Sequence, residues 1–161
     1  MSSSAKMIKS ILDPMLKRPD HIQTAALVYR VTPKGIQILT VTSRGTKRWI
    51  LPKGWPMEGK TLIQAAQTEA WEEAGLVNVV SPAFELGTFK YMKHLETGLP
   101  VPVVAHTFAF ETDELAKKFP EKGQRKRKWV DAKRAKKLLK HPEIGTLIDT
   151  LLVRFSERSS K

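Results

Sequence analysis

Three glutamates, Glu69, Glu72 and Glu73, are the residues whose types and spacing most directly indicate chemistry. On a helix, residues three and four positions apart are neighbours, so these carboxylates would share one face. Exposed like charges at that spacing repel by roughly a few tenths of a kcal/mol, and a bound cation reverses the sign of that interaction. Hard divalent cations take oxygen ligands, and enzymes that cleave phosphoanhydrides commonly use them. For the glutamates alone, a solvated acidic helix face is the alternative interpretation.

The neighbouring residues predict the helix that would position these carboxylates. Thr61 and Gln64 have the spacing of a capping box, which marks a helix start. Gly75 stands where a helix would end, and glycine takes the left-handed conformation there without strain. We therefore expect a helix over residues 62–74. Its small apolar stripe would let it lie close against a sheet, and the stripe is formed by Ile63, Ala66, Ala70 and Ala74.

Residues 52–76, PKGWPMEGKTLIQAAQTEAWEEAGL, resemble the Nudix box, the signature of hydrolases that cleave an organic diphosphate linked to a further group. The family pattern is GX5EX7REUXEEXGU, in which U is apolar. The positions that match it are Gly54, Glu69, Ala70, Glu72, Glu73, Gly75 and Leu76. Lys60 stands where the pattern has glutamate, and Thr68 stands where it has arginine. In the family that arginine pairs with a box glutamate and orients it, and threonine cannot form a bidentate charge pair.

The resemblance implies roles for the central residues of the box. Glu69, Glu72, Glu73 and the carbonyl oxygen of Lys53 are the expected metal ligands. Glu72 and Glu73 are the expected catalytic residues, with Glu72 either a ligand or the base that activates water. Mg²⁺ is the expected cofactor, with Mn²⁺ as the alternative.

Strong positive charge is the second chemical signal. The formal net charge is +12, from 28 Lys and Arg against 16 Asp and Glu. Residues 115–140 hold twelve Lys or Arg, and their only acids are Glu121 and Asp131. Such a field attracts polyanions and is screened by salt. A solvated lysine-rich surface, a nucleic-acid-binding surface and a site for a densely phosphorylated small molecule all fit this composition.

Segments outside the box are similar to the diphosphoinositol polyphosphate phosphohydrolases, which also cleave dinucleoside polyphosphates. Residues 42–52, TSRGTKRWILP, resemble their serine-arginine loop, and residues 125–129, RKRKW, resemble their Arg-Lys-Arg-Glu-Trp. The resemblance implies a polyphosphorylated small-molecule substrate bound by charge-assisted hydrogen bonds. The expected substrate-binding residues are Arg30, Arg44, Arg48, Lys53, Gly54, Lys93, His94, Arg125 and Arg127.

Two other functions fit the same residues. One is removal of pyrophosphate from RNA 5′ ends, which makes RNA a further candidate partner. The other is a Nudix-fold module that has lost catalytic strength and binds RNA or polyphosphate. The sequence ranks neither inositol pyrophosphates against dinucleoside polyphosphates nor one oligomeric state against another.

Strands and helices alternate in mixed order along the chain, which predicts helices on both sides of a mixed sheet. Strands are expected at residues 22–30, 36–42, 85–92, 103–110 and 126–130, and further helices at 132–140 and 143–155. This agrees with the α/β/α sandwich, of the α+β kind, that the resemblance implies. We expect a single Nudix hydrolase domain over residues 21–157, an N-terminal arm over 1–20 and a tail over 158–161.

Composition limits the remaining classes. The sequence contains no cysteine, which excludes disulfides and thiolate metal sites. No apolar run approaches the roughly 20 residues that span a bilayer, and the N-terminus lacks the apolar core of a secretory signal. The expected location is the cytoplasm, without a membrane partner.

Overall fold

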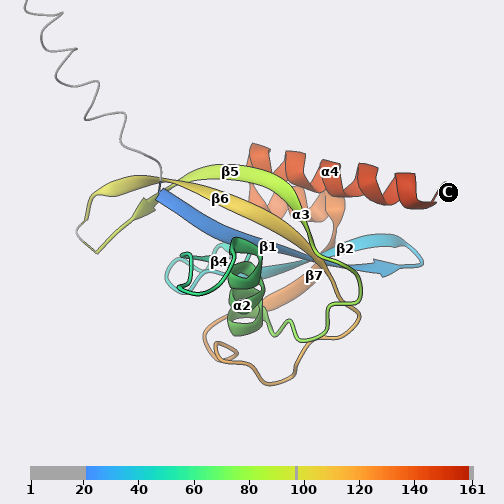
Figure 1. Cartoon of the computed structure of the whole chain (residues 1–161), viewed down its shortest axis with the longest axis horizontal. Coiled ribbons are helices and arrows are strands. Elements are labelled where there is room, and N and C mark those ends of the chain that lie inside the picture. The colour runs from blue at the N-terminus through green and yellow to red at the C-terminus, as the bar shows by residue number, and fades with distance from the viewer. Residues whose placement is uncertain (1–20, 97, 160–161) are drawn as a thin grey trace, which may run out of the picture.

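The computed structural model, which describes residues 21–96 and 98–159, contains a seven-stranded mixed sheet with helices on both faces (Figure 1). The main strand order is β3-β2-β1-β6-β5, with β4 paired to β1 and β7 paired to β2. The strands are β1 (His21–Thr32), β2 (Gly35–Thr42), β3 (Trp49–Ile50), β4 (Lys53–Gly54), β5 (Phe84–His94), β6 (Pro100–Glu111) and β7 (Arg127–Asp131). The helices are α2 (Leu62–Ala74), α3 (Ala132–Leu139) and α4 (Pro142–Ser159). The predicted arm at residues 1–20 lies outside the described residues.

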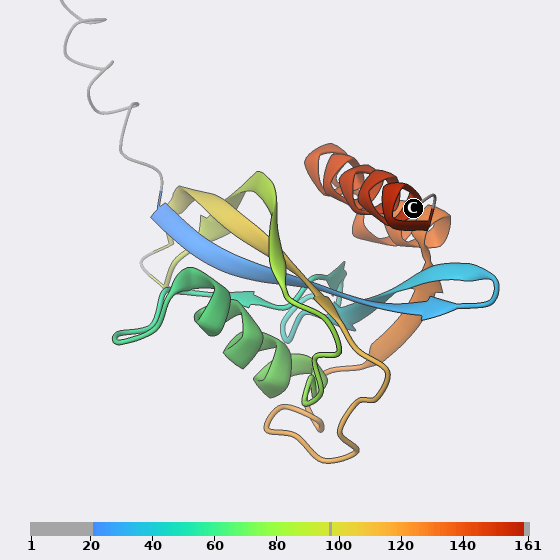
Figure 2. The same ribbon diagram turned by 45° about the vertical axis from the view of Figure 1, so that its right-hand side comes forward.

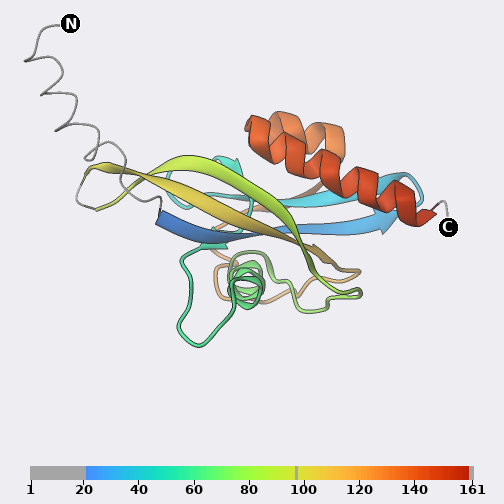
Figure 3. The ribbon, with the colours of Figure 1, turned by 45° about the horizontal axis from the view of Figure 1, so that its top comes forward.

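Helix α2 covers one face of the sheet, while α3 and α4 cover the other (Figure 3). Two separate cores result. Ala26 and Val28 of β1 pack toward α2, and Ala25 and Leu27 pack toward α4. This alternation of faces leaves β1 buried along most of its length, as expected for a central strand with helices on both sides. The predicted α/β/α sandwich is confirmed.

Pairing within the sheet is mixed. Strands β1 and β6 run parallel, and the other paired strands run antiparallel. The first two strands form a hairpin, with Thr32 opposite Gly35 and Tyr29 opposite Ile38.

Strand β4 explains how the Pro-Lys-Gly loop is held in place. Only the second half of β1 pairs with β2, and its first half instead pairs with Lys53 and Gly54. The backbone N–H of Ala26 also donates to the carbonyl of Pro52 at 2.9 Å. These bonds fix the loop against the central strand, beside α2.

Helix α2 begins and ends where the sequence predicts. The Thr61 hydroxyl accepts from the Gln64 N–H at 3.2 Å, and the Gln64 side chain accepts from the Thr61 N–H at 2.9 Å. Gly75 ends the helix with φ of 80°. The Thr24 hydroxyl of β1 donates to the Leu62 carbonyl at 2.7 Å, which ties the first turn to the sheet.

Two boundaries lie three or more residues from the predicted ones. The strand expected from residue 103 already begins at Pro100. Among the described residues, Pro102 pairs with Met92 of β5, and the pairing with β1 begins at Val103, so the proline stands where a missing N–H is tolerated. Helix α4 runs to Ser159, past the expected end at residue 155. Within residues 21–96 and 98–159, no helix is long and apolar enough to cross a membrane.

Candidate active site

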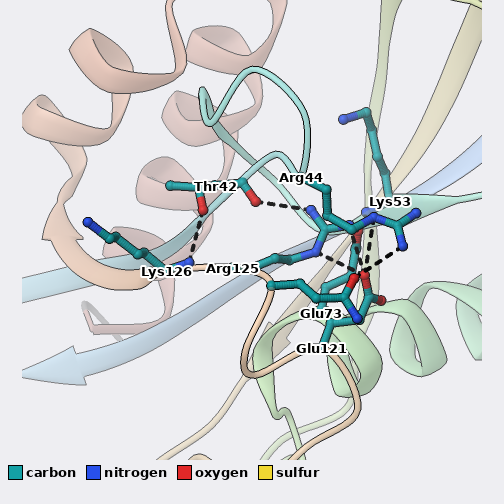
Figure 4. A network of polar contacts seen from close by, with 8 residues as sticks. Thr42, Arg44, Lys53, Glu73, Glu121, Arg125 and Lys126 are labelled. Atoms are coloured by element: carbon teal, nitrogen blue, oxygen red, sulfur yellow. Dashed lines mark hydrogen bonds and ion pairs between the residues drawn. The ribbon is translucent and has the colours of Figure 1, made fainter.

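The Glu73 carboxylate joins three segments of the chain. Its side chain is 4% exposed, and its Oε1 lies 2.7 Å from Arg125 Nη2 (Figure 4). Its Oε2 accepts a hydrogen bond from the backbone N–H of Lys53 at 2.8 Å. Helix α2, the Pro-Lys-Gly loop and the segment before β7 therefore meet at this one side chain.

Arg125 is a nearly buried guanidinium shared between two carboxylates and a carbonyl. Besides Glu73, it contacts Glu121 Oε1 through Nη2 at 3.1 Å and through Nε at 3.2 Å. Its Nη1 donates to the carbonyl oxygen of Thr42 at 3.0 Å. A buried charge needs such partners, since an unpaired one would cost several kcal/mol. Arg125 is thus fixed in position by its own hydrogen bonds.

The loop that carries Glu121 is anchored on α2. The backbone N–H of Glu121 donates to the carbonyl oxygen of Glu72 at 2.9 Å. Figure 2 shows this loop, in orange, beside the end of the green α2 helix. The contact places a fourth carboxylate next to the three glutamates of the box.

The Glu69 carboxylate lies directly against Gly54. A Cβ added at Gly54 would lie 2.2 Å from Glu69 Oε1, closer than any two such atoms can approach. Glycine at this position therefore permits the close approach of loop and helix.

Burial raises the pKa of both Glu69 and Glu73 to about 7. For Glu69, the charges of Glu72 and Glu121 raise the pKa further. For Glu73, Arg125 opposes the rise, while Glu69 and Glu121 add to it. These partly buried carboxylates repel one another when ionised. A divalent cation with oxygen ligands would relieve that repulsion and replace the bound protons.

The carboxylates do not form a ready-made metal cluster. Among the described residues, no three Asp, Glu, His or Cys side chains converge closely enough to hold a metal ion. In this arrangement both oxygens of Glu73 face nitrogen donors, namely Lys53 N and Arg125 Nη2. The chemistry of the donor set fits a hard cation, whereas the ligand assignments of Glu69, Glu72, Glu73 and Lys53 stay predictions.

Several of the predicted basic residues gather around Lys53. Burial lowers the pKa of the Lys53 ammonium to about 8. The nearby charge of Glu73 opposes that shift, and the charges of Lys93, Arg125 and Arg48 add to it. The Lys53 Nζ lies 5.2 Å from the centroid of the Tyr91 ring. Three further cations are therefore close enough to act on the Lys53 ammonium.

Two further predicted residues, Arg44 and His94, have exposed side chains. Arg44 Nε lies 3.6 Å from Glu121 Oε1. The Lys93 Nζ lies 5.9 Å from the centroid of the Trp55 ring. His94 is exposed at the end of β5, opposite Pro100 in the β5–β6 hairpin.

Arg30 and Arg127 have partners elsewhere in the fold. The Arg30 guanidinium lies 4.5 Å from the centroid of the Trp129 ring and donates to the Gln37 side chain at 2.7 Å. Arg127 donates to the carbonyl oxygen of Ala74 at 2.8 Å. Both line a cavity of about 250 Å³. Their predicted role in binding substrate stays a prediction, because these contacts support the fold.

Two residues near Lys53 and the box glutamates were not among the predicted site residues. Glu121 is one of only two acids in residues 115–140, and that isolation was the available signal. Trp55 directly follows Gly54, and its side chain is exposed. Glu111, the last residue of β6, accepts from the Ser81 and Tyr29 hydroxyls at 3.0 and 3.4 Å.

The two residues that depart from the box pattern contact each other. Lys60 Nζ donates to the Thr68 hydroxyl at 2.8 Å, and that hydroxyl donates to the Gln64 carbonyl at 3.0 Å. The pair fastens the loop before α2 to the second turn of the helix.

The chain is similar to known proteins over most of its described length. "Nudix hydrolase 13, mitochondrial" from Arabidopsis thaliana is 25% identical over 130 residues, covering 78% of this chain and 64% of that protein. "Nudix hydrolase 16, mitochondrial" from the same plant is 30% identical over 110 residues, covering 68% of this chain and 61% of that protein. The chain thus spans somewhat less than two thirds of the length of these relatives.

Solved structures share the fold. A binary complex of the C. elegans Ap4A hydrolase superimposes with a TM-score of 0.63 at 20% identity, covering 85% of this chain and 98% of that one. The NUDIX domain of Shewanella oneidensis NrtR, complexed with ADP ribose, gives a TM-score of 0.63 at 15% identity, covering 94% and 99% of the two chains. The family model of the NUDIX domain matches residues 21–151, from the first strand into α4. The chain therefore belongs to the NUDIX domain family.

Proposed function

We propose that this chain hydrolyses phosphoanhydride bonds of polyphosphorylated small molecules and requires a divalent cation, Mg²⁺ or Mn²⁺. The observation that carries the proposal is the meeting of carboxylates and cations at Glu73. Glu69 and Glu121 are close enough to raise its pKa, and Arg125 contacts it directly. The backbone N–H of Lys53 donates to the Glu73 carboxylate, and the Lys53 ammonium is close enough for Glu73 to raise its pKa. A polyphosphate needs both features, because its anhydride is attacked while its other phosphates must be held.

Each group has a distinct proposed role. Glu69, Glu73 and the carbonyl oxygen of Lys53 would hold the cation, which when bound supplies charge neutralisation and orientation of the attacking water. Glu72 accepts a proton from that water as the water oxygen bonds to phosphorus. The bridging oxygen then leaves with the second phosphate.

The cations support a polyphosphorylated substrate class. The charges of Lys93, Arg125 and Arg48 all act on the Lys53 ammonium and lower its pKa. Like charges disfavour one another's charged forms, and the several negative charges of a polyphosphate would offset this repulsion through charge-assisted hydrogen bonds. Dinucleoside polyphosphates and diphosphoinositol polyphosphates both meet this condition.

The test is a substrate panel with Mg²⁺ and colorimetric phosphate detection. It contains diadenosine polyphosphates, inositol pyrophosphates, nucleoside triphosphates, ADP-ribose and triphosphorylated RNA. Loss of a general base typically lowers the rate by about 10²- to 10⁴-fold, so Glu72→Gln should reduce kcat by that order. Glu157→Gln, which removes an exposed carboxylate from α4, is the matched control and should retain full activity.

Glu73→Gln should also abolish turnover, but it alters the Arg125 contact as well. Circular dichroism and thermal melting must therefore show that this variant is folded. If the unaltered protein releases phosphate from no substrate of the panel and binds RNA in a salt-sensitive way, the hydrolase proposal is rejected and a binding module is favoured.

A further inference from the structure

Trp55 lies beside the cation cluster, which consists of Lys53, Lys93, Arg48 and Arg125. Its side chain is 40% exposed. Its ring meets the His21 ring edge-on, with 6.1 Å between centroids and 77° between planes. The Lys93 Nζ lies 5.9 Å from the indole centroid. The indole is therefore held in place between the start of β1 and the end of β5, while much of its surface stays open.

The neighbours of Lys53 and Trp55 place the Trp55 ring on the same side as the Lys53 ammonium. Tyr91 and Lys93 lie two residues apart on β5, so their side chains share one face of that strand. A Cβ on the intervening Gly54 would instead point at Glu69. Lys53 and Trp55 each lie near a residue of β5, Tyr91 and Lys93 respectively. Lys53, Lys93 and the partly exposed Trp55 ring therefore lie along the same face of β5.

We propose that Trp55 is the platform on which a nucleobase of the substrate stacks, while Lys53 and Lys93 bind the phosphates between that base and the box carboxylates. The proposal rests on the proposed function and narrows it to nucleotide-bearing polyphosphates. Every nucleobase has a π-face that can stack on an indole. An inositol ring has none, so it cannot stack on Trp55 in this way.

Affinity measurements on Trp55→Ala and Trp55→Phe test this role whether or not the protein turns substrate over. Diadenosine tetraphosphate is the base-bearing probe, and inorganic tripolyphosphate is the base-free probe for the same cations. Stacking energies predict that Trp55→Ala weakens binding of the diadenosine compound about 10- to 100-fold. Tripolyphosphate binding should stay within about twofold, since it reports only on the charges. Trp55→Phe should recover most of the loss because it retains an aromatic face.

Val153→Ala is the matched control, because it truncates an exposed apolar side chain on α4, away from the cation cluster. It should change neither affinity. Equal weakening of both probes in Trp55→Ala would show that Trp55 only supports the loop, and unchanged affinity for both would show that no base stacks there. Either result overturns the inference and leaves the proposed hydrolysis standing. Failure of the hydrolysis would instead appear as an inactive unaltered protein that still discriminates between the probes.

Discussion

At the scale of single residues, Glu73 shows how burial and charge compete. Arg125 and the Lys53 N–H both favour the carboxylate form, yet burial outweighs them and the pKa of Glu73 rises to about 7. The guanidinium reaches this glutamate from residue 125, although position 68 of the box carries threonine. A charged partner for a box glutamate is therefore present, supplied from the other end of the domain.

The raised pKa values predict proton release when a cation binds. The pKa of Glu69 and of Glu73 is about 7 in the folded protein, against an ordinary value of 4.5. Between these values the folded chain holds protons that the unfolded chain has lost, so these groups stabilise less as pH rises through that window. A bound cation requires the ionised carboxylates and would expel the protons. At pH 6.5, Mn²⁺ binding should therefore release on the order of one proton.

Calorimetric titration in two buffers with different ionisation enthalpies measures this release. The number of protons should fall toward zero at pH 8.5, where both groups are already ionised, and Mn²⁺ should bind more weakly at pH 6 than at pH 8. Glu73→Gln should release fewer protons at pH 6.5. Identical heats in both buffers at pH 6.5 would show that the carboxylates are ionised before the cation binds.

At the scale of elements, the contact between Lys60 and Thr68 indicates that the two unusual residues of the box are coupled. They lie on opposite sides of the start of α2 and join the loop to the helix. Lys60→Glu alone would lose this hydrogen bond, and Thr68→Arg alone would set two positive charges together. The double variant would restore an oppositely charged pair. We expect each single variant to lower stability by a few tenths of a kcal/mol, as is usual for exposed pairs, and the double variant to recover it.

Urea unfolding of the four proteins forms a double-mutant cycle that measures this coupling. Kinetics on the same four proteins would show whether the loop also affects turnover. If the two single substitutions change the free energy of unfolding additively, the side chains at positions 60 and 68 do not interact.

Elements set by local signals could be predicted, and those set by distant pairing could not. Both ends of α2 are set by residues at the ends themselves, namely Thr61 and Gln64 at its start and Gly75 at its end. The sequence alone therefore predicted the bounds of this helix. The insertion of β4 beside β1 depends on backbone pairing between residues 24–25 and 53–54, for which no local pattern exists. The same holds for the contact between Glu73 and Arg125, which the sequence places far apart.

At the scale of the whole molecule, positive charge alone does not identify a binding surface. Residue types predicted nine substrate-binding positions, but they could not assign them to faces of the sheet. Arg30 and Arg127 stack on Trp129 and Phe119, while Lys53 and Lys93 lie by Tyr91 and Trp55. Which face a side chain occupies depends on strand register, and register depends on the complete sheet.

The net charge of +12 predicts a salt-dependent Michaelis constant, and the structure predicts which cations carry that dependence. The Debye length is about 10 Å at 0.1 M salt and about 3 Å at 1 M. Salt should therefore screen the capture of a polyphosphate and raise KM for diadenosine tetraphosphate, by roughly tenfold between 0.05 and 0.5 M KCl if several cations contribute. The catalytic constant should change little, because the Glu73 carboxylate of the site is buried and salt screens buried charges much less.

Two charge-removing variants separate a local cluster from a diffuse field. Lys93→Gln removes a cation that acts directly on Lys53. Lys133→Gln removes the same charge from the exposed surface of α3. Lys93→Gln should raise KM several-fold at low salt and flatten the dependence on KCl, whereas Lys133→Gln should leave both nearly unchanged. Equal effects of the two variants on KM would mean that the substrate responds to the overall charge of the molecule, and that the cluster around Lys53 has no special part in capturing it.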